Sequence, residues 1–226
     1  MKEHIVFPDP ESTDEEGLLC YGGNLLPETL LSAYSQGIFP WYDASNPILW
    51  WSPPMRMVMN PKEMFVSKSL KSIIRKDIFE VRFDNNFEDV IKQCAKVKRA
   101  NQKGTWITKE MIEAYINLHH LGYAHSVESY LNDKLVGGLY GISLGKAFFG
   151  ESMFHLASNA SKVAFYYLVQ RLITWDFHLI DAQQNTKHLK SLGAYEIERK
   201  VFLNLLQKSL KYDTVCGNWS EEGIKV

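Results

Sequence analysis

The 226-residue chain is long enough for one large domain, or for a medium-sized domain with a smaller partner. Its composition, 46% hydrophobic and 23% charged, is that of a folded globular protein. It has no run of about eighteen or more apolar residues, which excludes a transmembrane helix. The acidic first residues lack the apolar core of a signal peptide, so we expect a cytosolic protein.

The charge and the cysteines narrow the class of protein further. The net charge of −1 excludes a general polycation, but residues 66–104 carry ten basic and five acidic side chains. Such a local excess can attract a phosphate backbone, although a solvated helix face is the more common explanation of a basic run. The three cysteines are odd in number and far apart, which favours free thiols over a disulfide framework or a zinc site: Cys20, Cys94 and Cys216.

The N-terminal part is rich in turn-forming Gly and Pro and in aromatic side chains. One short helix is predicted over residues 24–36, with Pro27 in its first turn and Gly37 at its end. The remaining residues read as loops that pack through aromatic rings. We therefore expect a small N-terminal domain over 1–60 that lies against the rest of the chain.

After residue 60 the pattern becomes regular and predicts a second domain over 61–226. Helices are expected at 87–97, at 109–121 behind Thr108 as N-cap, at 159–174 and in a segment that ends near Gly193. Strands are expected at 124–130, 134–142, 146–153, 177–183 and 195–205. A strand meander followed by alternating helices and strands predicts an α+β (mixed α/β) fold.

Two features inside the expected strands stand out chemically. Gly137 and Gly138 interrupt a well-patterned strand, which indicates a bulge or a close approach of another backbone. Glu151 lies in an aromatic and sulfur-rich strand, where a buried carboxylate needs a partner or a function. If Glu151 instead lies at the strand end, solvent alone accounts for it.

The strand Leu-Ile-Asp-Ala-Gln at 179–183 carries the strongest local signal. Side chains alternate along a strand, so Asp181 and Gln183 are expected on one face and Ile180 and Ala182 on the other. A carboxylate beside a primary amide can orient the amide so that its carbonyl accepts a hydrogen bond from an amine. An edge pair with a capping role is the alternative.

Trp106 follows the basic stretch and precedes a predicted helix, a position that suits stacking on a nucleobase as well as a place in the core. Other motifs are missing. The sequence has no Walker A loop, no GxGxxG, no GxSxG and no HExxH, so neither a nucleoside triphosphate nor a metal is expected.

Taken together, these stretches resemble the leucyl/phenylalanyl-tRNA–protein transferases. The motifs GIFPW at 37–41, ILWWSP at 48–53 and GESMF at 150–154 are specific in combination. Shorter matches continue nearly to the end of the chain in the order of the family: GTWIT at 104–108, HSVE at 125–128, GGLYG at 137–141, LIDAQ at 179–183 and SLGA at 191–194.

The resemblance implies a small N-terminal domain and an acyl-N-transferase-like domain with a largely antiparallel central sheet. It also implies a cytoplasmic, metal-free and cofactor-free enzyme that moves leucine or phenylalanine, with methionine as an open third case, from aminoacyl-tRNA. The acceptor would be a protein that begins with Lys or Arg, which is thereby marked for degradation by the N-end rule pathway.

The resemblance further implies roles for individual residues. Trp106, Trp41 and Tyr115 would hold the terminal adenosine of the tRNA. Asp181, Gln183 and Glu151 would be the polar residues at the reacting ester. The side chain of the donor amino acid would enter a pocket lined by Leu139, Met153, Leu168, Ile180 and Ala182.

This assignment agrees with elementary chemistry. An aminoacyl ester is already activated, so attack by an amine needs no ATP and no covalent enzyme intermediate. The protein must hold two substrates in line and provide hydrogen bonds as charge develops. We expect Gln183, oriented by Asp181, to accept a hydrogen bond from the attacking amine.

Two other classes of protein remain as alternatives. An acyl-CoA-dependent N-acetyltransferase would need a glycine-containing pyrophosphate loop before the helix at 159, and residues 155–158 contain no glycine. A non-catalytic tRNA-binding module would explain the basic stretch and Trp106. It would leave Asp181, Gln183 and Glu151 without a role.

Overall fold

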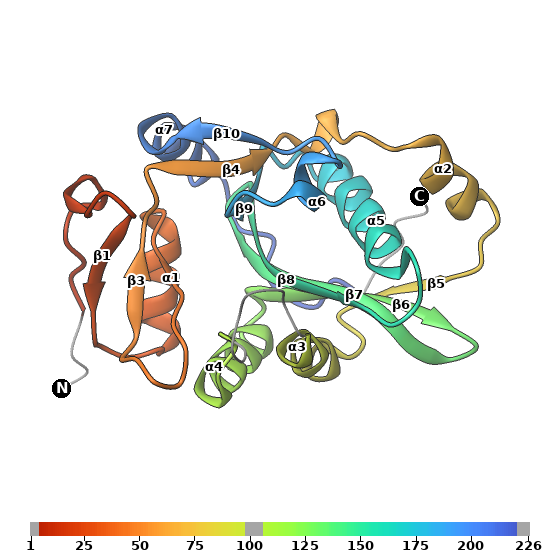
Figure 1. Cartoon of the computed structure of the whole chain (residues 1–226), viewed down its shortest axis with the longest axis horizontal. Helices are drawn as coiled ribbons and strands as arrows, with labels where there is room; N and C mark the ends of the chain where they lie inside the picture. Colours follow the sequence, from red (N-terminus) through yellow and green to blue (C-terminus); the bar gives the residue numbers. More distant parts are fainter. Residues whose placement is uncertain (1–4, 98–105, 221–226) are drawn as a thin grey trace.

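The computed structural model describes residues 5–97 and 106–220, which form two sheets surrounded by helices (Figure 1). The smaller, three-stranded sheet has the order β1-β3-β2. The larger, seven-stranded sheet has the order β10-β4-β9-β8-β7-β6-β5. Within the described residues every strand pair is antiparallel except β8 with β9, which confirms the predicted α+β fold with a largely antiparallel sheet.

The elements follow one another along the chain in two groups. The N-terminal group comprises β1 (Leu18–Tyr21), α1 (Pro27–Ser35), β2 (Phe39–Pro40) and β3 (Leu49–Trp51). The second group has strands β4 (Met55–Met59), β5 (Glu80–Phe83), β6 (Ala124–Leu131), β7 (Lys134–Leu144), β8 (Ala147–His155), β9 (Leu179–Gln183) and β10 (Tyr195–Glu198). Its helices are α2 (Lys68–Arg75), α3 (Phe87–Lys96), α4 (Lys109–His120), α5 (Ala160–Thr174), α6 (Lys187–Lys190) and α7 (Arg199–Ser209).

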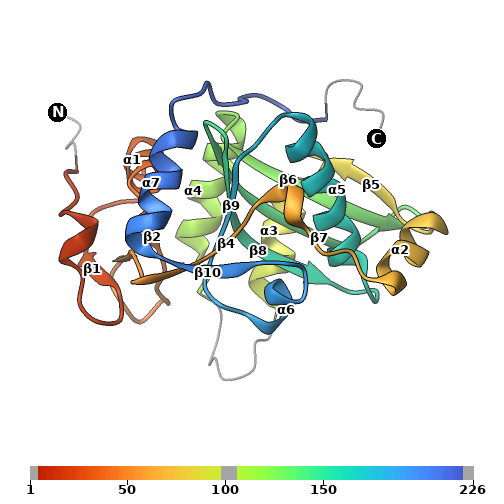
Figure 2. The same cartoon turned by 90° about the horizontal axis from the view of Figure 1, so that it is seen from above.

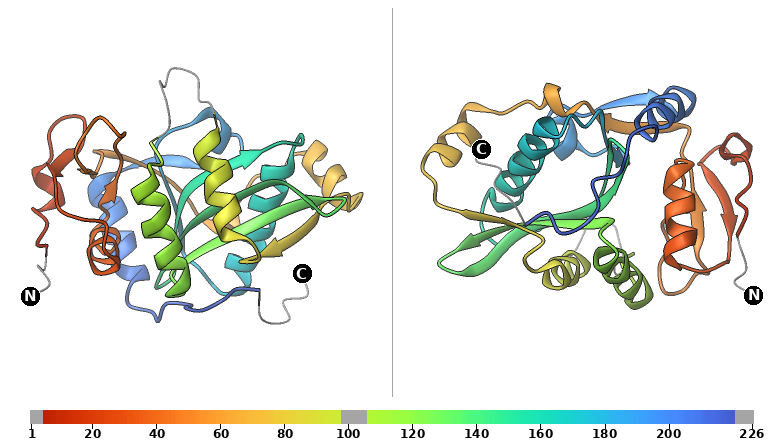
Figure 3. Two further views of the ribbon diagram at one scale, coloured as in Figure 1. Left: turned by 90° about the horizontal axis from the view of Figure 1, so that it is seen from below. Right: turned by 180° about the vertical axis from the view of Figure 1, so that it is seen from behind.

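Helices cover both faces of the large sheet. α5 lies on one face, whereas α3 and α4 lie side by side on the other, as the view from below shows (Figure 3). α5 buries Phe165, Leu168, Val169 and Leu172, which recur at helical spacing and therefore form one apolar stripe. Thr108 caps α4 as predicted, because its hydroxyl accepts a hydrogen bond from the backbone N–H of Met111 at 3.2 Å.

The N-terminal segment contains more regular structure than its sequence predicted. The helix α1 is confirmed, with Pro27 in its first turn. Residues that read as loops form the strands β1, β2 and β3. The ring of Trp50 in β3 is buried, and its Nε1–H donates to the carbonyl of Gly22 at 2.9 Å, which ties this strand to the residues after β1. β4 falls inside the predicted range 1–60 yet pairs with β9 and β10 in the large sheet. The division at residue 60 stays a prediction.

The strand predicted over residues 195–205 is wrong beyond Glu198. β10 ends there, and Arg199 begins the helix α7, in which Phe202, Leu206 and Ser209 are buried at helical spacing. α7 packs beside α1, as seen from above (Figure 2). A Cβ atom on Gly37 would meet Leu203 Cδ2 at 2.6 Å, so this contact also explains the glycine that ends α1. The sequence reasoning also missed β4, α2 and β5.

Both explanations for the double glycine in β7 hold. The register between β6 and β7 shifts next to Gly137, which marks a bulge. A Cβ atom on Gly137 would lie 2.5 Å from Cβ of Ala160, so the glycine also lets the first turn of α5 approach the sheet. The hydroxyl of Ser129 donates to the carbonyl of Ala160 at 2.9 Å across the same contact. This contact fixes where α5 begins.

A second buried acid, Glu128, lies on β6 at the end of the HSVE motif. Oε1 of Glu128 accepts hydrogen bonds from the Ser126 hydroxyl at 2.5 Å and from the Asn86 backbone N–H at 3.3 Å. Oε2 is buried without a partner among the described residues. Burial raises the pKa of Glu128 from 4.5 to about 7, because the charged form loses its solvation.

We expect Glu128 to make the folded chain less stable as the pH rises. Its pKa is higher in the folded state than in the unfolded state, so its stabilising effect is complete below about pH 4.5 and is lost as the pH rises through about 7. The variant Glu128→Gln should abolish this contribution, up to about 3 kcal/mol. Urea unfolding of both proteins between pH 5 and pH 8 measures it. Parallel pH profiles of the two proteins would contradict the assignment.

Candidate active site

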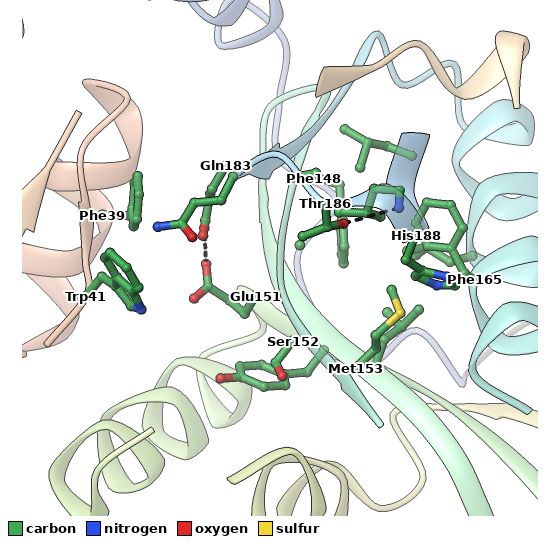
Figure 4. A pocket seen from close by; sticks show the side chains of 18 of the residues that line it. Phe39, Trp41, Phe148, Glu151, Ser152, Met153, Phe165, Gln183, Thr186 and His188 are labelled. Carbon is green, nitrogen blue, oxygen red and sulfur yellow. Dashed lines mark hydrogen bonds between the residues drawn. The ribbon is translucent and has the colours of Figure 1, made fainter. Parts of the chain in front are cut away.

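A cavity of about 330 Å³ opens where β8 and β9 separate. The two strands pair in parallel only from Ala147 with Leu179 to Phe149 with Asp181, and their following residues move apart. The gap is closed by α5, by α6 and by the segment around β2, as the close view shows (Figure 4). The main side chains on its wall are Phe39, Trp41, Trp106, Leu139, Glu151, Met153, Phe165, Leu168, Ile180, Ala182, Gln183 and His188.

The cavity has an apolar end and a polar end. Met153, Phe165 and His188 lie at one end, whereas the side chains of Glu151 and Gln183 meet at the other, beside Trp41 (Figure 4). All five residues predicted for an amino-acid pocket lie on this wall: Leu139, Met153, Leu168, Ile180 and Ala182. Sequence reasoning missed Phe165 and His188, because neither residue lies in one of the motifs that carry the resemblance.

Glu151 is aimed at the cavity by a β-bulge. Gly141 of β7 pairs with Gly150 and Tyr140 pairs with Ser152, so Glu151 is the extra residue between two paired positions. A bulge of this kind turns one side chain out of the normal alternation. Glu151 is therefore neither at a strand end nor solvated, and it has the buried partners that its position requires.

Three side chains from distant parts of the chain surround the Glu151 carboxyl group. The hydroxyl of Tyr34 donates to Oε1 at 2.7 Å, the hydroxyl of Tyr115 donates to Oε2 at 3.1 Å, and Nε2 of Gln183 donates to Oε1 at 2.7 Å. Burial raises the pKa of Glu151 to about 7, although these hydrogen bonds favour the charged form. The group can thus be neutral or charged near neutral pH.

Asp181 has a partner other than the predicted one. Its carboxylate is fully buried and accepts two hydrogen bonds from Arg56, from Nε at 2.8 Å and from Nη2 at 2.6 Å. The guanidinium group of Arg56 lies between the rings of Phe39 and Phe202, at 4.6 and 4.5 Å from their centres. The positive charge of Arg56 therefore compensates the negative charge of Asp181 inside the protein.

The prediction that Asp181 orients the amide of Gln183 is wrong in its geometry. Asp181 Oδ1 accepts from the backbone N–H of Gln183 at 2.9 Å, and the side-chain amide is held by Glu151 instead. The alternation fails because the register with β4 shifts between these two residues and because Gln183 has a φ of +61°. Gln183 faces the cavity and Asp181 does not.

The three residues predicted to hold an adenosine lie in two different places. Trp41 and Trp106 lie on the cavity wall, and the ring of Trp41 packs edge-on against Trp51 with centres 5.6 Å apart. Tyr115 is fully buried behind the wall, where its hydroxyl contacts Glu151. Part of the predicted basic stretch, Lys98, Arg99 and Lys103, lies outside the described residues.

The sequence comparisons identify the family. The model of the leucyl/phenylalanyl-tRNA protein transferase family matches residues 58–207, which is more than half of the chain. The chain belongs to this family. A second model, for the N-terminal domain of leucyl/phenylalanyl-tRNA protein transferases, matches residues 23–54. The predicted resemblance and the predicted enzyme class, an aminoacyltransferase, are confirmed.

Relatives in this transferase family match over almost their full length. The transferase of Thermodesulfovibrio yellowstonii is 53% identical over 222 residues, which cover 98% of this chain and 91% of the relative. Those of Legionella pneumophila (strain Corby) and Myxococcus xanthus are 54% and 50% identical, each over 96% of this chain and over 97% and 92% of the relatives. A solved structure of a functionally unknown conserved protein from Staphylococcus epidermidis overlaps 80% of this chain and 68% of its own, with a TM-score of 0.44 and 13% identity.

The described residues lack two further features. No group of three or more His, Cys, Asp or Glu side chains is arranged to hold a metal ion there. In the same residues, no helix has the length and apolar character needed to cross a bilayer.

Removing one partner of the ion pair at the back of the transferase site should be costly, because the other charge is then left buried. We expect Arg56→Met to destabilise the chain by about 3–5 kcal/mol, because it leaves the Asp181 carboxylate buried without a counterion. Urea unfolding measures the loss. The double variant Arg56→Met/Asp181→Leu should recover part of it, since both charges are then absent.

Lys62→Met is the matched control for this experiment. It removes a hydrogen-bonded ion pair to Asp176 of similar length, 2.9 Å, whose side chains are 59% and 70% exposed. Its cost should be small, because solvent screens an ion pair between two exposed side chains. Equal losses in Arg56→Met and Lys62→Met would show that burial does not set the strength of the Arg56 pair.

Proposed function

We propose that this chain transfers leucine or phenylalanine from aminoacyl-tRNA to the N-terminal amine of proteins that begin with Lys or Arg. One observation carries the proposal: Glu151 and Gln183 are hydrogen-bonded beside the indole ring of Trp41, at the polar end of a cavity whose wall also includes Trp106. An apolar side chain, a reactive ester and an adenosine follow one another in the same order in an aminoacyl-tRNA end. We propose that the reaction takes place in the cytoplasm and marks acceptors for degradation by the N-end rule pathway.

The donor binds through contacts of two kinds. Its leucine, phenylalanine or methionine side chain enters the apolar end, which rejects polar side chains more strongly than it separates apolar ones. We assign seven residues to this part of the wall: Leu139, Met153, Phe165, Leu168, Ile180, Ala182 and His188. The terminal adenine stacks on Trp106 beside Trp41, and Tyr115 supports this end of the site indirectly through Glu151.

The polar residues then act on the ester. Because Nε2 of Gln183 is held by Glu151, its carbonyl oxygen is left to accept a hydrogen bond from the incoming amine. That bond directs the nitrogen lone pair at the ester carbon, and fixed orientation of this kind can contribute about 7–11 kcal/mol in favourable cases. The role of Asp181 is indirect, since it fixes the backbone of Gln183 and the guanidinium group of Arg56.

The acceptor class rests on the family resemblance. Peptides that begin with Arg, Lys or Ala, offered with labelled leucyl-tRNA, test it directly. Transfer to the first two peptides and not to the third is the expected result, and RNase should abolish it. Transfer from acetyl-CoA in place of aminoacyl-tRNA would instead favour an N-acetyltransferase.

We predict that Gln183→Ala slows aminoacyl transfer about 100-fold without weakening donor binding, because the amide acts on the amine and not on the tRNA. Asp181→Ala should also slow transfer, through the displaced end of β9. Single-turnover rates with saturating leucyl-tRNA and an Arg-initiated peptide measure both. Asn204→Ala, on the exposed side of α7, is the control and should keep the normal rate. Normal transfer by Gln183→Ala would refute the role of the amide.

Trp106→Ala should weaken donor binding about tenfold or more, because stacking contributes about 1–3 kcal/mol per base. Trp106→Phe keeps an aromatic face and should retain most of the affinity. Equilibrium binding of a non-hydrolysable aminoacyl-adenosine analogue to the three proteins gives the comparison. Equal affinity in all three would remove Trp106 from the adenosine site.

A further inference from the structure

Three buried side-chain groups form a closed ring of hydrogen bonds behind the cavity. Tyr34 of α1 and Tyr115 of α4 each contact the Glu151 carboxyl group, at 2.7 Å and 3.1 Å. The two tyrosine oxygens also contact each other at 2.5 Å. Tyr34 and Tyr115 are fully buried, and Glu151 is 8% exposed. The ring therefore exchanges protons with solvent only by way of the cavity.

The ring needs three protons. Each of its three contacts requires one proton between two oxygens, and the two phenols supply only two. If Glu151 were charged, both phenols would donate to it, and their oxygens would face each other at 2.5 Å with no proton between them. A neutral Glu151 supplies the third proton. It then donates to Tyr115, Tyr115 donates to Tyr34, and Tyr34 donates back to Glu151.

The surroundings of the ring agree with this count. Burial is the main cause that raises the pKa of Glu151 to about 7, and Asp181 adds to the effect. Arg56 is paired with Asp181, so its positive charge is already compensated there. Burial also keeps both phenols protonated by raising each pKa well above 10. The groups that face Glu151 or its partners are Tyr34 from α1, Tyr115 from α4, Tyr140 from β7, Asp181 and Gln183 from β9, and Arg56 from β4.

We propose that this ring stores the proton that aminoacyl transfer requires, with Glu151 as the catalytic residue that gives it to the leaving ribose oxygen. Tyr34 and Tyr115 are then positioning residues. The inference rests on the proposed function and adds to it a general acid and a contribution from α1, which lies far from β8 in sequence.

The step balances without any further reactant. The lone pair of the neutral acceptor amine forms the new C–N bond, and the ester C–O bond breaks with its electron pair on the ribose oxygen. Glu151 gives its proton to that oxygen and becomes a carboxylate. The carboxylate then takes the proton that the nitrogen loses, so the products are the amide, a free tRNA hydroxyl and neutral Glu151.

The ring suits this task because it stabilises both states of Glu151. The carboxylate formed during the step still accepts from Tyr34 and from Nε2 of Gln183, and the Tyr115 hydroxyl turns from Tyr34 to donate to it as well. Only the contact between the two phenols loses its proton. A carboxyl group that changes charge without a change in its partners loses little energy to reorganisation.

The first test measures the proton directly. In the full chain with ¹³C-labelled glutamate carboxyl groups, NMR titration should show Glu151 taking up its proton near pH 7. Glu151→Gln and Glu128→Gln assign the two high-titrating resonances. In Tyr34→Phe the midpoint should rise by about one pH unit, because the carboxylate loses a donor. Tyr130→Phe removes a hydroxyl that accepts from Asn85 at the far end of β6, and it should leave the midpoint unchanged.

The second test measures transfer. Wild-type single-turnover rates should fall on the alkaline side of their optimum as Glu151 loses its proton, and Glu151→Gln should be at least about tenfold slower and lack that fall. Tyr34→Phe should lower kcat and leave KM for leucyl-tRNA unchanged. Circular dichroism checks that each variant is folded.

Two results would overturn the inference while the proposed function stands. One is a Glu151 that titrates near its ordinary value of 4.5 in a protein that transfers leucine normally. The other is an alkaline fall that survives in Glu151→Gln. Absence of transfer in the wild type, by contrast, would defeat the proposed function itself.

Discussion

The site depends on one constraint in the large sheet, namely that β8 and β9 pair as parallel strands over only three residues each before they separate. Hydrogen bonding between neighbouring strands normally continues to the strand ends, and a separated pair leaves backbone groups and apolar side chains that other elements must cover. Here α5, α6 and the segment around β2 cover them and leave the cavity. Two register shifts at the same place, in β8 beside Glu151 and in β9 beside Ala182, turn the polar side chains toward it.

The Arg56–Asp181 pair maintains this geometry from behind. It joins β4 to β9, and the guanidinium group also donates to the carbonyl of Gly37 at 3.2 Å, which lies between α1 and β2. A buried charge pair of this kind adds little net stability, because desolvation offsets most of the attraction. The pair instead fixes the relative orientation of the elements that it joins. A bidentate pair has one good geometry, and that geometry fixes the backbone of Gln183 relative to the carbonyl of Gly37.

The N-terminal segment is part of the site and not an appendage. It contributes Phe39 and Trp41 to the cavity wall and Tyr34 to the Glu151 ring. The contact between α1 and α7 at Gly37 holds it in place. An enzyme that must bring a tRNA end and a protein terminus together gains from a site shared by two parts of the chain, because both parts must be correctly placed before the polar groups line up.

The sequence alone determined the local features of the chain and its family. Periodic apolar residues gave α3, α4 and α5, Thr108 gave a helix start, and the motif combination gave the transferase family and the membership of the cavity wall. These features depend on a residue and its near neighbours, so they can be recognised from spacing.

Only the tertiary structure decided how the polar residues are paired. Asp181 and Gln183 were expected on one face because strand side chains alternate, but a register shift and a positive φ at Gln183 separate them. Tyr34 lay in a helical stripe without a distinctive motif, Arg56 lay outside the motifs, and Tyr115 was assigned to an adenosine, whereas its hydroxyl is buried against Glu151. Their partners are 36 to 125 residues away in the chain. A bulge shifts every later side chain by one position and a long-range hydrogen bond has no sequence period, so pairing of this kind is fixed by the folded sheet and not by any local pattern.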